Sequence, residues 1–250
     1  MKFNYLLLSL TFLWQGQLYA QPSDVDYVAG YAGLALFVST ETILKTQLAP
    51  TNARWEKPNS IDLFFRDQFK WQNQNLKQAG TYSDVLLMGI FLPSVFWSPL
   101  ISNQKYSHHL LVNIQAMAAT GLLTSAAKFV FARERPYVYF ETLKSSGIDD
   151  HLSFFSGHTS ITFAIATSTA MMFEDQNPAV SGLIWSSSLS LAAATGFLRI
   201  AADKHYFSDV FVGAVTGFFT AYIITKENKE DYFGNREPKA DFTFNYSFTF

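Results

Sequence analysis

The sequence predicts an all-α protein, a helical bundle of about five to six core helices, with a short β-strand at the C-terminus. Two observations predict the bundle. Hydrophobic residues make up 49% of the 250-residue chain, which is ample for a core. Runs with almost no charge also recur along the chain, and we expect each to form a helix. The runs are 27–40, 85–100, 110–127, 159–173, 177–198 and 210–225.

The N-terminus resembles an export signal. Lys2 supplies positive charge, residues 6–14 are apolar, and "LYA" ending at Ala20 resembles a cleavage site. We therefore predict a signal peptide over 1–20, an exported protein of the bacterial cell envelope, and a helical domain over 21–225. The alternative is that the segment stays in place as an uncleaved anchor.

The C-terminus changes character after Thr225. Residues 226–240 are highly charged and contain Gly234 and Pro238, which predicts a polar linker. Residues 241–250, "DFTFNYSFTF", alternate aromatic and polar side chains, which is typical of a strand. This strand-like tail resembles the closing strand of outer-membrane barrels, so outer-membrane association is one interpretation. The other is a strand that pairs with the protein's own surface or with another chain.

Composition excludes some partners and leaves the membrane question open. A formal charge of −2 provides no basic surface for nucleic acid. The absence of cysteine excludes disulfides, a thiol nucleophile and cysteine-based metal sites. The uncharged runs are 14 to 22 residues long, mostly shorter than the roughly 20 residues that span a bilayer. Integral membrane and soluble periplasmic bundles both remain open, as does the oligomeric state.

One of the five histidines stands out. His158 follows Ser156 and Gly157 and precedes a helix-like run, so Ser156 can cap a helix whose free N–H groups would bind an anion. We expect His108 and His109 to be solvated in a polar turn, and His151 to be a surface residue.

Two further segments carry charge in regular spacing. Lys128 and Arg135 are seven residues apart, which would place both cations on one helix face before Pro136 ends the helix. Downstream, Arg199 is followed by His205 and Asp209. A helical separation of four would let the Asp209 carboxylate accept one imidazole N–H of His205 and leave the other nitrogen basic.

Together the three segments supply what phosphoryl transfer needs: fixed cations for the phosphate oxygens, an attacking group and an acid for the leaving oxygen. Their order and spacing resemble the signature of the type 2 phosphatidic acid phosphatase superfamily, which includes bacterial acid phosphatases and vanadium haloperoxidases. Two positions depart from the family pattern: Phe155 replaces a proline and Leu198 replaces a serine.

The resemblance implies a metal-independent phosphatase without a cofactor. His205 would attack phosphorus and form a phosphohistidine, Asp209 would orient it, and His158 would protonate the leaving group. The phosphate-binding residues would be Lys128, Arg135, Ser156, Gly157 and Arg199. The substrate would be a lipid (di)phosphate or a small phosphomonoester, hydrolysed on the outer side of the inner membrane.

Two alternatives stay open at this point. A vanadium-dependent haloperoxidase would hold vanadate in the same cradle. A noncatalytic envelope protein would keep the bundle and use its aromatic tail for binding.

Overall fold

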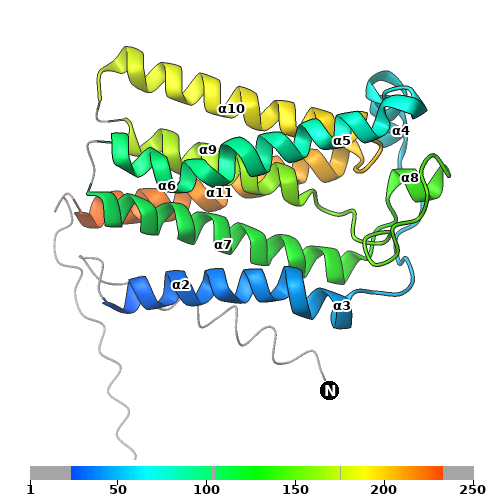
Figure 1. Cartoon of the computed structure of the whole chain (residues 1–250), viewed down its shortest axis with the longest axis horizontal. Coiled ribbons are helices and arrows are strands. Elements are labelled where there is room, and N and C mark those ends of the chain that lie inside the picture. The colour runs from blue at the N-terminus through cyan, green and yellow to red at the C-terminus, as the bar shows by residue number, and fades with distance from the viewer. Residues whose placement is uncertain (1–23, 103–104, 175, 233–250) are drawn as a thin grey trace, which may run out of the picture.

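A computed structural model describes residues 24–102, 105–174 and 176–232; the predicted signal peptide and the aromatic tail lie outside these ranges. All six predicted helices are present in the described part of the chain, and they form a bundle of roughly parallel rods (Figure 1). They are α2 (Asp24–Ser39), a continuous segment of α5 (Leu76–Asp84), η3 (Val85–Phe91) and α6 (Leu92–Ile101), then α7 (Tyr106–Phe131), α9 (Gly157–Met172), α10 (Pro178–Ala201) and α11 (Phe207–Tyr232).

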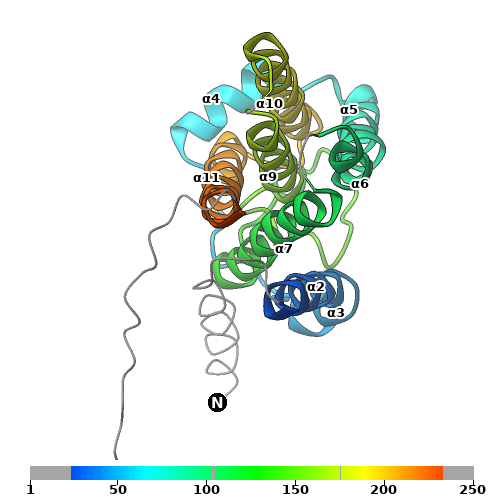
Figure 2. The ribbon, with the colours of Figure 1, turned by 90° about the vertical axis from the view of Figure 1, so that its left-hand side faces the viewer.

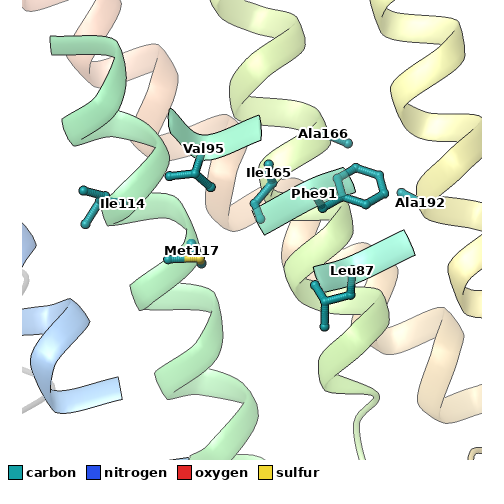
Figure 3. Close-up of a cluster of buried hydrophobic side chains, with 8 residues drawn as sticks. All are labelled: Leu87, Phe91, Val95, Ile114, Met117, Ile165, Ala166 and Ala192. Carbon is teal, nitrogen blue, oxygen red and sulfur yellow. The ribbon is translucent and has the colours of Figure 1, made fainter. Parts of the chain in front are cut away.

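Helix α9 lies at the centre of the bundle and packs against α7, α10 and α11 (Figure 2). Its Ala164, Ile165 and Ala170 are fully buried. The main apolar cluster joins α9 to the neighbouring η3, α6, α7 and α10 (Figure 3). Its members are Leu87, Phe91, Val95, Ile114, Met117, Ile165, Ala166 and Ala192.

The close packing of α11 on α9 depends on glycine. A Cβ atom added at Gly217 would lie 2.0 Å from the Ser160 carbonyl oxygen, and one at Gly213 would lie 2.9 Å from that of Ser156. Because glycine has no side chain, α11 can approach the backbone of α9 directly at these two positions.

Short helices cover one end of the bundle. They are η1 (Thr40–Leu44) and α3 (Lys45–Leu48), which continue α2, then α4 (Ser60–Phe69), η2 (Asn73–Asn75) and α8 (Pro136–Tyr139). Helix α4 is capped by Asn59, whose side chain accepts a hydrogen bond from the Asp62 amide (2.8 Å). It packs against α10 and α11.

Two predictions differ from the structure. Helix α11 continues through Tyr232, into the segment predicted to be a linker. The Lys and Glu residues there are good helix formers, so their intrinsic propensity favours continuation of the helix. His108 and His109 are buried in the first turns of α7 rather than solvated, because this part of α7 lies against its neighbours.

Candidate active site

The predicted site residues meet at one end of the bundle, the end that carries α4 and α8 in Figure 1. Lys128 lies in the last turn of α7, and Arg199 in the last turn of α10. His158 lies in the first turn of α9, and Asp209 in the first turn of α11. Four helix ends that are far apart in sequence therefore supply one site.

A cavity of about 520 Å³ opens at this end. Six of the eight predicted residues line it: Lys128, Arg135, Gly157, His158, Arg199 and His205. The other two, Ser156 and Asp209, are fully buried behind its wall. The structure thus separates residues that can touch a substrate from residues that support them.

Ser156 caps α9, as the sequence predicts. Its hydroxyl oxygen accepts hydrogen bonds from the amide of Thr159 (3.4 Å) and from the Thr159 hydroxyl (2.9 Å). Gly157, the first residue of the helix, faces the cavity: a Cβ atom there would lie 3.3 Å from Lys128 Nζ. Of these two predicted phosphate-binding residues, Gly157 at the helix start lines the cavity and the Ser156 side chain does not.

Lys128 and Arg135 reach the cavity, but not from one helix face. Helix α7 ends at Phe131, and Ala132 takes a left-handed conformation (φ 43°) that turns the chain before Arg135. The Arg135 guanidinium is then held by three backbone carbonyls, those of Asp149 (2.8 Å), Leu152 (3.3 Å) and Lys204 (3.2 Å). Loop backbone, not helical spacing, aims this cation.

The cradle contains cationic groups that are buried and unsatisfied. Within the described residues, Arg199 Nε is buried without a hydrogen-bond partner. Lys128 is 8% exposed, and no hydrogen bond or salt bridge of its ammonium occurs in that part of the chain. Burying such cations is costly unless an anion completes the site.

The geometry of His205 leaves one ring nitrogen basic. Its Nδ1 lies 2.9 Å from the Ser153 carbonyl oxygen, which can only accept, so Nδ1 carries the proton. Its Nε2 is therefore unprotonated and carries the lone pair, which accepts a hydrogen bond from Arg135 Nη1 (3.2 Å). Burial lowers the pKa of His205 well below its ordinary value, and the charge of Arg135 lowers it further.

Asp209 supports His205 differently from the prediction. His205 precedes α11, so the two residues do not share a helix face, and Asp209 Oδ2 lies 3.6 Å from Nδ1. The carboxylate instead accepts hydrogen bonds from the Tyr206 amide (2.9 Å) and the Ser153 hydroxyl (2.6 Å). It thus holds both segments that flank the His205 ring and contributes negative charge at short range.

Arg133 is a further residue of this network, and our reading of the sequence missed it. Its guanidinium is 1% exposed and joins two buried carboxylates, those of Asp209 (2.5 Å) and Asp62 (2.5 Å). The rings of Trp55 and Tyr206 lie 3.9 and 4.2 Å from its Cζ atom. The "RER" triplet at 133–135 is a sequence signal for Arg133, but nothing in the sequence connects Asp62 to it.

His158 has a carboxylate partner, Asp84, which we also missed. The Asp84 Oδ1 atom lies 2.8 Å from His158 Nε2 and 3.4 Å from Arg199 Nη1. His158 lies outside the segments that could span a membrane. Burial lowers its pKa to about 3, and the charge of Arg199 adds to this effect, while the hydrogen bond to Asp84 opposes it.

The two departures from the family pattern do not reach the cavity. Leu198 packs against an apolar cluster of Ala79, Ala201 and Ala202. Phe155 is buried with 6% of its surface exposed, and its ring contacts Phe154. Both side chains therefore fill apolar space, and neither of them lines the cavity.

Buried cations, a helix start and two histidines around one cavity define the class of site that binds and transforms a phosphate group. The comparisons with known proteins place the chain more closely. The model of the PAP2 superfamily matches residues 110–231, which contain every predicted site residue. Over this region, which is just under half of its length, the chain belongs to this superfamily.

Two curated relatives carry related names. Phospholipid phosphatase 1 of Rattus norvegicus is 25% identical, with 59% of this chain and 66% of the relative covered. Lipid A 1-phosphatase of Porphyromonas gingivalis is 30% identical, with 46% of this chain and 23% of the relative covered. The chain thus spans less than two thirds of the length of these relatives. A crystal structure of Aquifex aeolicus LpxE is similar at a TM-score of 0.47 and 20% identity, with 73% of this chain and 93% of that chain covered.

Proposed function

We propose that this protein is a membrane-embedded phosphatase that removes phosphate from lipid phosphates through a phosphohistidine intermediate, without a metal ion. The observation that carries the proposal is the position of His205: a backbone carbonyl holds its Nδ1, which leaves Nε2 unprotonated, and the residue lines the cavity together with Lys128, Arg135 and Arg199. A neutral imidazole at a bound phosphate is a nucleophile, and the cations stabilise the charge that moves onto the phosphate oxygens.

The first half of the reaction transfers the phosphoryl group to the protein. His205 Nε2 attacks phosphorus as the bond from phosphorus to the ester oxygen breaks. The leaving oxygen takes a proton from His158. Lys128, Arg135 and Arg199 hold the other phosphate oxygens in this step.

The second half releases phosphate. His158, now neutral, accepts a proton from a water molecule as the water oxygen attacks phosphorus. The bond from phosphorus to Nε2 breaks, its electron pair returns to the imidazole, and both histidines regain their starting states.

Protonation of His158 accompanies substrate binding in this proposal. In the cradle without an anion, burial and the surrounding cations keep His158 neutral. A phosphate monoester monoanion brings its own proton, and its negative charge favours the imidazolium form.

The cavity supports a lipid substrate because its lining combines apolar and charged side chains. The apolar ones include Phe37, Leu87, Met88, Leu92 and Ile161. The charged ones include Lys144 and Lys204. An amphiphilic phosphate ester contains a partner for both kinds of side chain, and the names of both curated relatives agree with such a substrate.

The outer surface supports a membrane location. Five helical segments are long and apolar enough to cross a membrane: Val25–Leu48, Asn73–Ile101, Tyr106–Phe131, Pro178–Ala201 and Phe207–Asn228. Large apolar side chains such as Leu100, Leu183 and Phe219 are exposed on them, as lipid contact requires. We further propose that the active site faces the periplasm.

Phosphate release tests the proposed function. The substrates are phosphatidate, an isoprenyl diphosphate and a small phosphomonoester, each with a metal chelator present. We expect turnover by the wild type, and a loss of at least about 10³-fold in His205→Ala and His158→Ala, as for other catalytic groups that act together. The control is His151→Ala, because His151 does not line the cavity.

Three outcomes would contradict the proposal. A folded wild type that releases no phosphate excludes the phosphatase. Complete inhibition by the chelator excludes the metal-independent reaction. Normal turnover by His205→Ala excludes His205 as the nucleophile.

A further inference from the structure

Asp84 contacts two groups of the cavity, His158 and Arg199. It is the last residue of α5, and its carboxylate lines the cavity with 49% of the side chain exposed. One oxygen, Oδ1, lies 2.8 Å from His158 Nε2 and 3.4 Å from Arg199 Nη1.

The local structure holds this carboxylate in place. The neighbouring residue, Ser83, is fully buried and accepts a hydrogen bond from Arg199 Nη1 (3.0 Å). Helix α5 packs closely on the loop after α10: a Cβ atom at Gly80 would lie 3.2 Å from Lys204 Nζ. Immediately after Asp84 the chain changes from an α-helix to the π-helix of Val85–Phe91, a form that is frequent at functional sites.

His158 and His205 use opposite ring nitrogens to hold the ring in place. An ionised carboxylate only accepts, so His158 Nε2 carries a proton toward Asp84. No partner of His158 Nδ1 occurs within the described residues, so this nitrogen is available to a substrate in the cavity. In His205 the order is reversed: Nδ1 is held by backbone and Nε2 is available.

The other charged or titratable groups around His158 do not favour its protonation. Lys128 from α7, Arg199 from α10, and Arg135 and Lys204 from the connecting loops are cationic, and His205 is neutral. Of the other carboxylates that line the cavity, Asp149 pairs with Lys45 (2.6 Å) and Glu41 accepts from Ser125 (2.8 Å). Asp84 is thus the carboxylate that contacts His158 in the described structure.

We propose that Asp84 is a positioning residue for general-acid catalysis: it fixes the His158 ring through Nε2 and stabilises the imidazolium that donates its Nδ1 proton to the leaving alkoxide. This inference rests on the proposed phosphatase reaction. It makes a specific demand on the substrate, since a leaving group that departs without a proton does not need Asp84.

The test compares two phosphate esters in the full-length Asp84→Asn variant. One is phosphatidate, whose alkoxide must be protonated to leave, and the other is p-nitrophenyl phosphate, whose phenolate leaves unaided. We expect kcat for phosphatidate to fall by roughly 10- to 100-fold, a part of the usual contribution of a general acid. We expect kcat for p-nitrophenyl phosphate to change little.

The pH profile provides the second readout. Loss of the carboxylate removes a stabilising charge from the imidazolium, so the pKa of His158 in the complex falls. Hydrolysis of phosphatidate requires protonated His158. As the pH rises, the variant therefore loses activity at a lower pH than the wild type does. We expect the alkaline limb of kcat to move to lower pH in Asp84→Asn and to stay near the wild-type position in Asp84→Glu. If Asp84→Asn does not fold, Asp84→Glu still tests the role of the carboxylate.

Two controls separate this role from others. Glu41→Gln removes a carboxylate that lines the same cavity but does not contact His158. We expect this variant to change kcat for the two substrates by the same factor. In the His158→Ala background, Asp84→Asn has no further effect if it acts through His158.

Several outcomes would overturn the inference. If kcat fell equally for both esters and the alkaline limb did not move, Asp84 would have a purely structural role or would act only through Arg199. Higher activity in Asp84→Asn would identify the carboxylate as an obstacle to phosphate binding. An inactive wild type would instead contradict the proposed function itself, and with it this inference.

Discussion

Arg133 shows how a single buried side chain connects the nucleophile to the rest of the protein. Its hydrogen bonds to Asp209 and Asp62 join α11 to α4. Its Nη1 also donates a hydrogen bond to the Ser208 hydroxyl oxygen (2.7 Å). The backbone supports this position, because residues around Trp55 pair with those around Arg133 in an isolated β-bridge. The guanidinium therefore neutralises two carboxylates that have no access to water.

We predict that Arg133→Met is strongly destabilising, by about 3–5 kcal/mol, because it leaves two buried carboxylates without a cation. Arg133→Lys retains the charge but cannot bind both carboxylates through a planar fork, so we expect an intermediate loss. Thermal unfolding of the purified protein in detergent measures both effects. Equal stability of Arg133→Met and the wild type would show that the network contributes nothing to folding.

Residue types and order in the sequence pointed to six residues that line the cavity, but not to the supporting residues Arg133, Asp62 and Asp84. Lys128, His158 and Arg199 lie in the first or last turns of helices whose existence hydrophobic patterning predicts. Asp62 and Asp84 are separated from their partners by more than 70 residues and lie in a polar stretch without a recognisable motif. Their role depends on tertiary contacts, for which one sequence carries no signal.

At the scale of elements, the existence of the helices was predictable from the sequence. The exact helix ends, which determine how the site residues are arranged, were not. His205 and Asp209 have helical spacing, yet α11 begins at Phe207, because the chain must first turn after α10. Lys128 and Arg135 likewise have helical spacing, but the left-handed Ala132 ends α7 between them. Helix ends depend on capping and loop contacts, which periodicity does not contain.

The crossing of α9 and α11 determines where Asp209 and Ser156 meet. The Ser156 amide donates to the Asp209 carbonyl oxygen (3.0 Å), directly beside the contact of Gly213 with Ser156. One turn further along α11, Gly217 contacts Ser160. A separation of the two helices at this crossing would move Asp209 away from the start of α9.

We predict that Gly217→Ala lowers stability by about 1–3 kcal/mol, because the added methyl group would overlap the Ser160 carbonyl oxygen and force α11 outward. Activity would fall as well, since Asp209 moves with α11. The matched control is Gly182→Ala on α10, where nothing lies within 4 Å of the added atom. Thermal unfolding and phosphate release measure both effects, and identical results for the two variants would contradict the role of this crossing.

At the scale of the molecule, the direction of α2 connects two predictions about location. Helix α2 begins at the end of the bundle opposite the cavity, and Lys45, which follows it, lines the cavity (Figure 1). If α2 crosses the membrane, a periplasmic site requires Asp24 on the cytoplasmic side. Cleavage after Ala20 would instead leave Gln21 on the outer side. In a bundle that spans the membrane, α2 crosses together with α7, against which it packs, so a cleaved signal and a periplasmic site exclude each other.

Cysteine accessibility can decide the orientation, because the chain contains no cysteine. Ile148→Cys places a thiol at the cavity end, and Ala179→Cys places one at the opposite end, at the start of α10; both positions are exposed. If the site faces the periplasm, a membrane-impermeant maleimide labels Ile148→Cys in intact cells and labels Ala179→Cys only after the inner membrane is permeabilised. Unchanged phosphate release serves as the control for folding. The reverse pattern would place the site in the cytoplasm, and labelling of both positions in intact cells would contradict a membrane-spanning bundle.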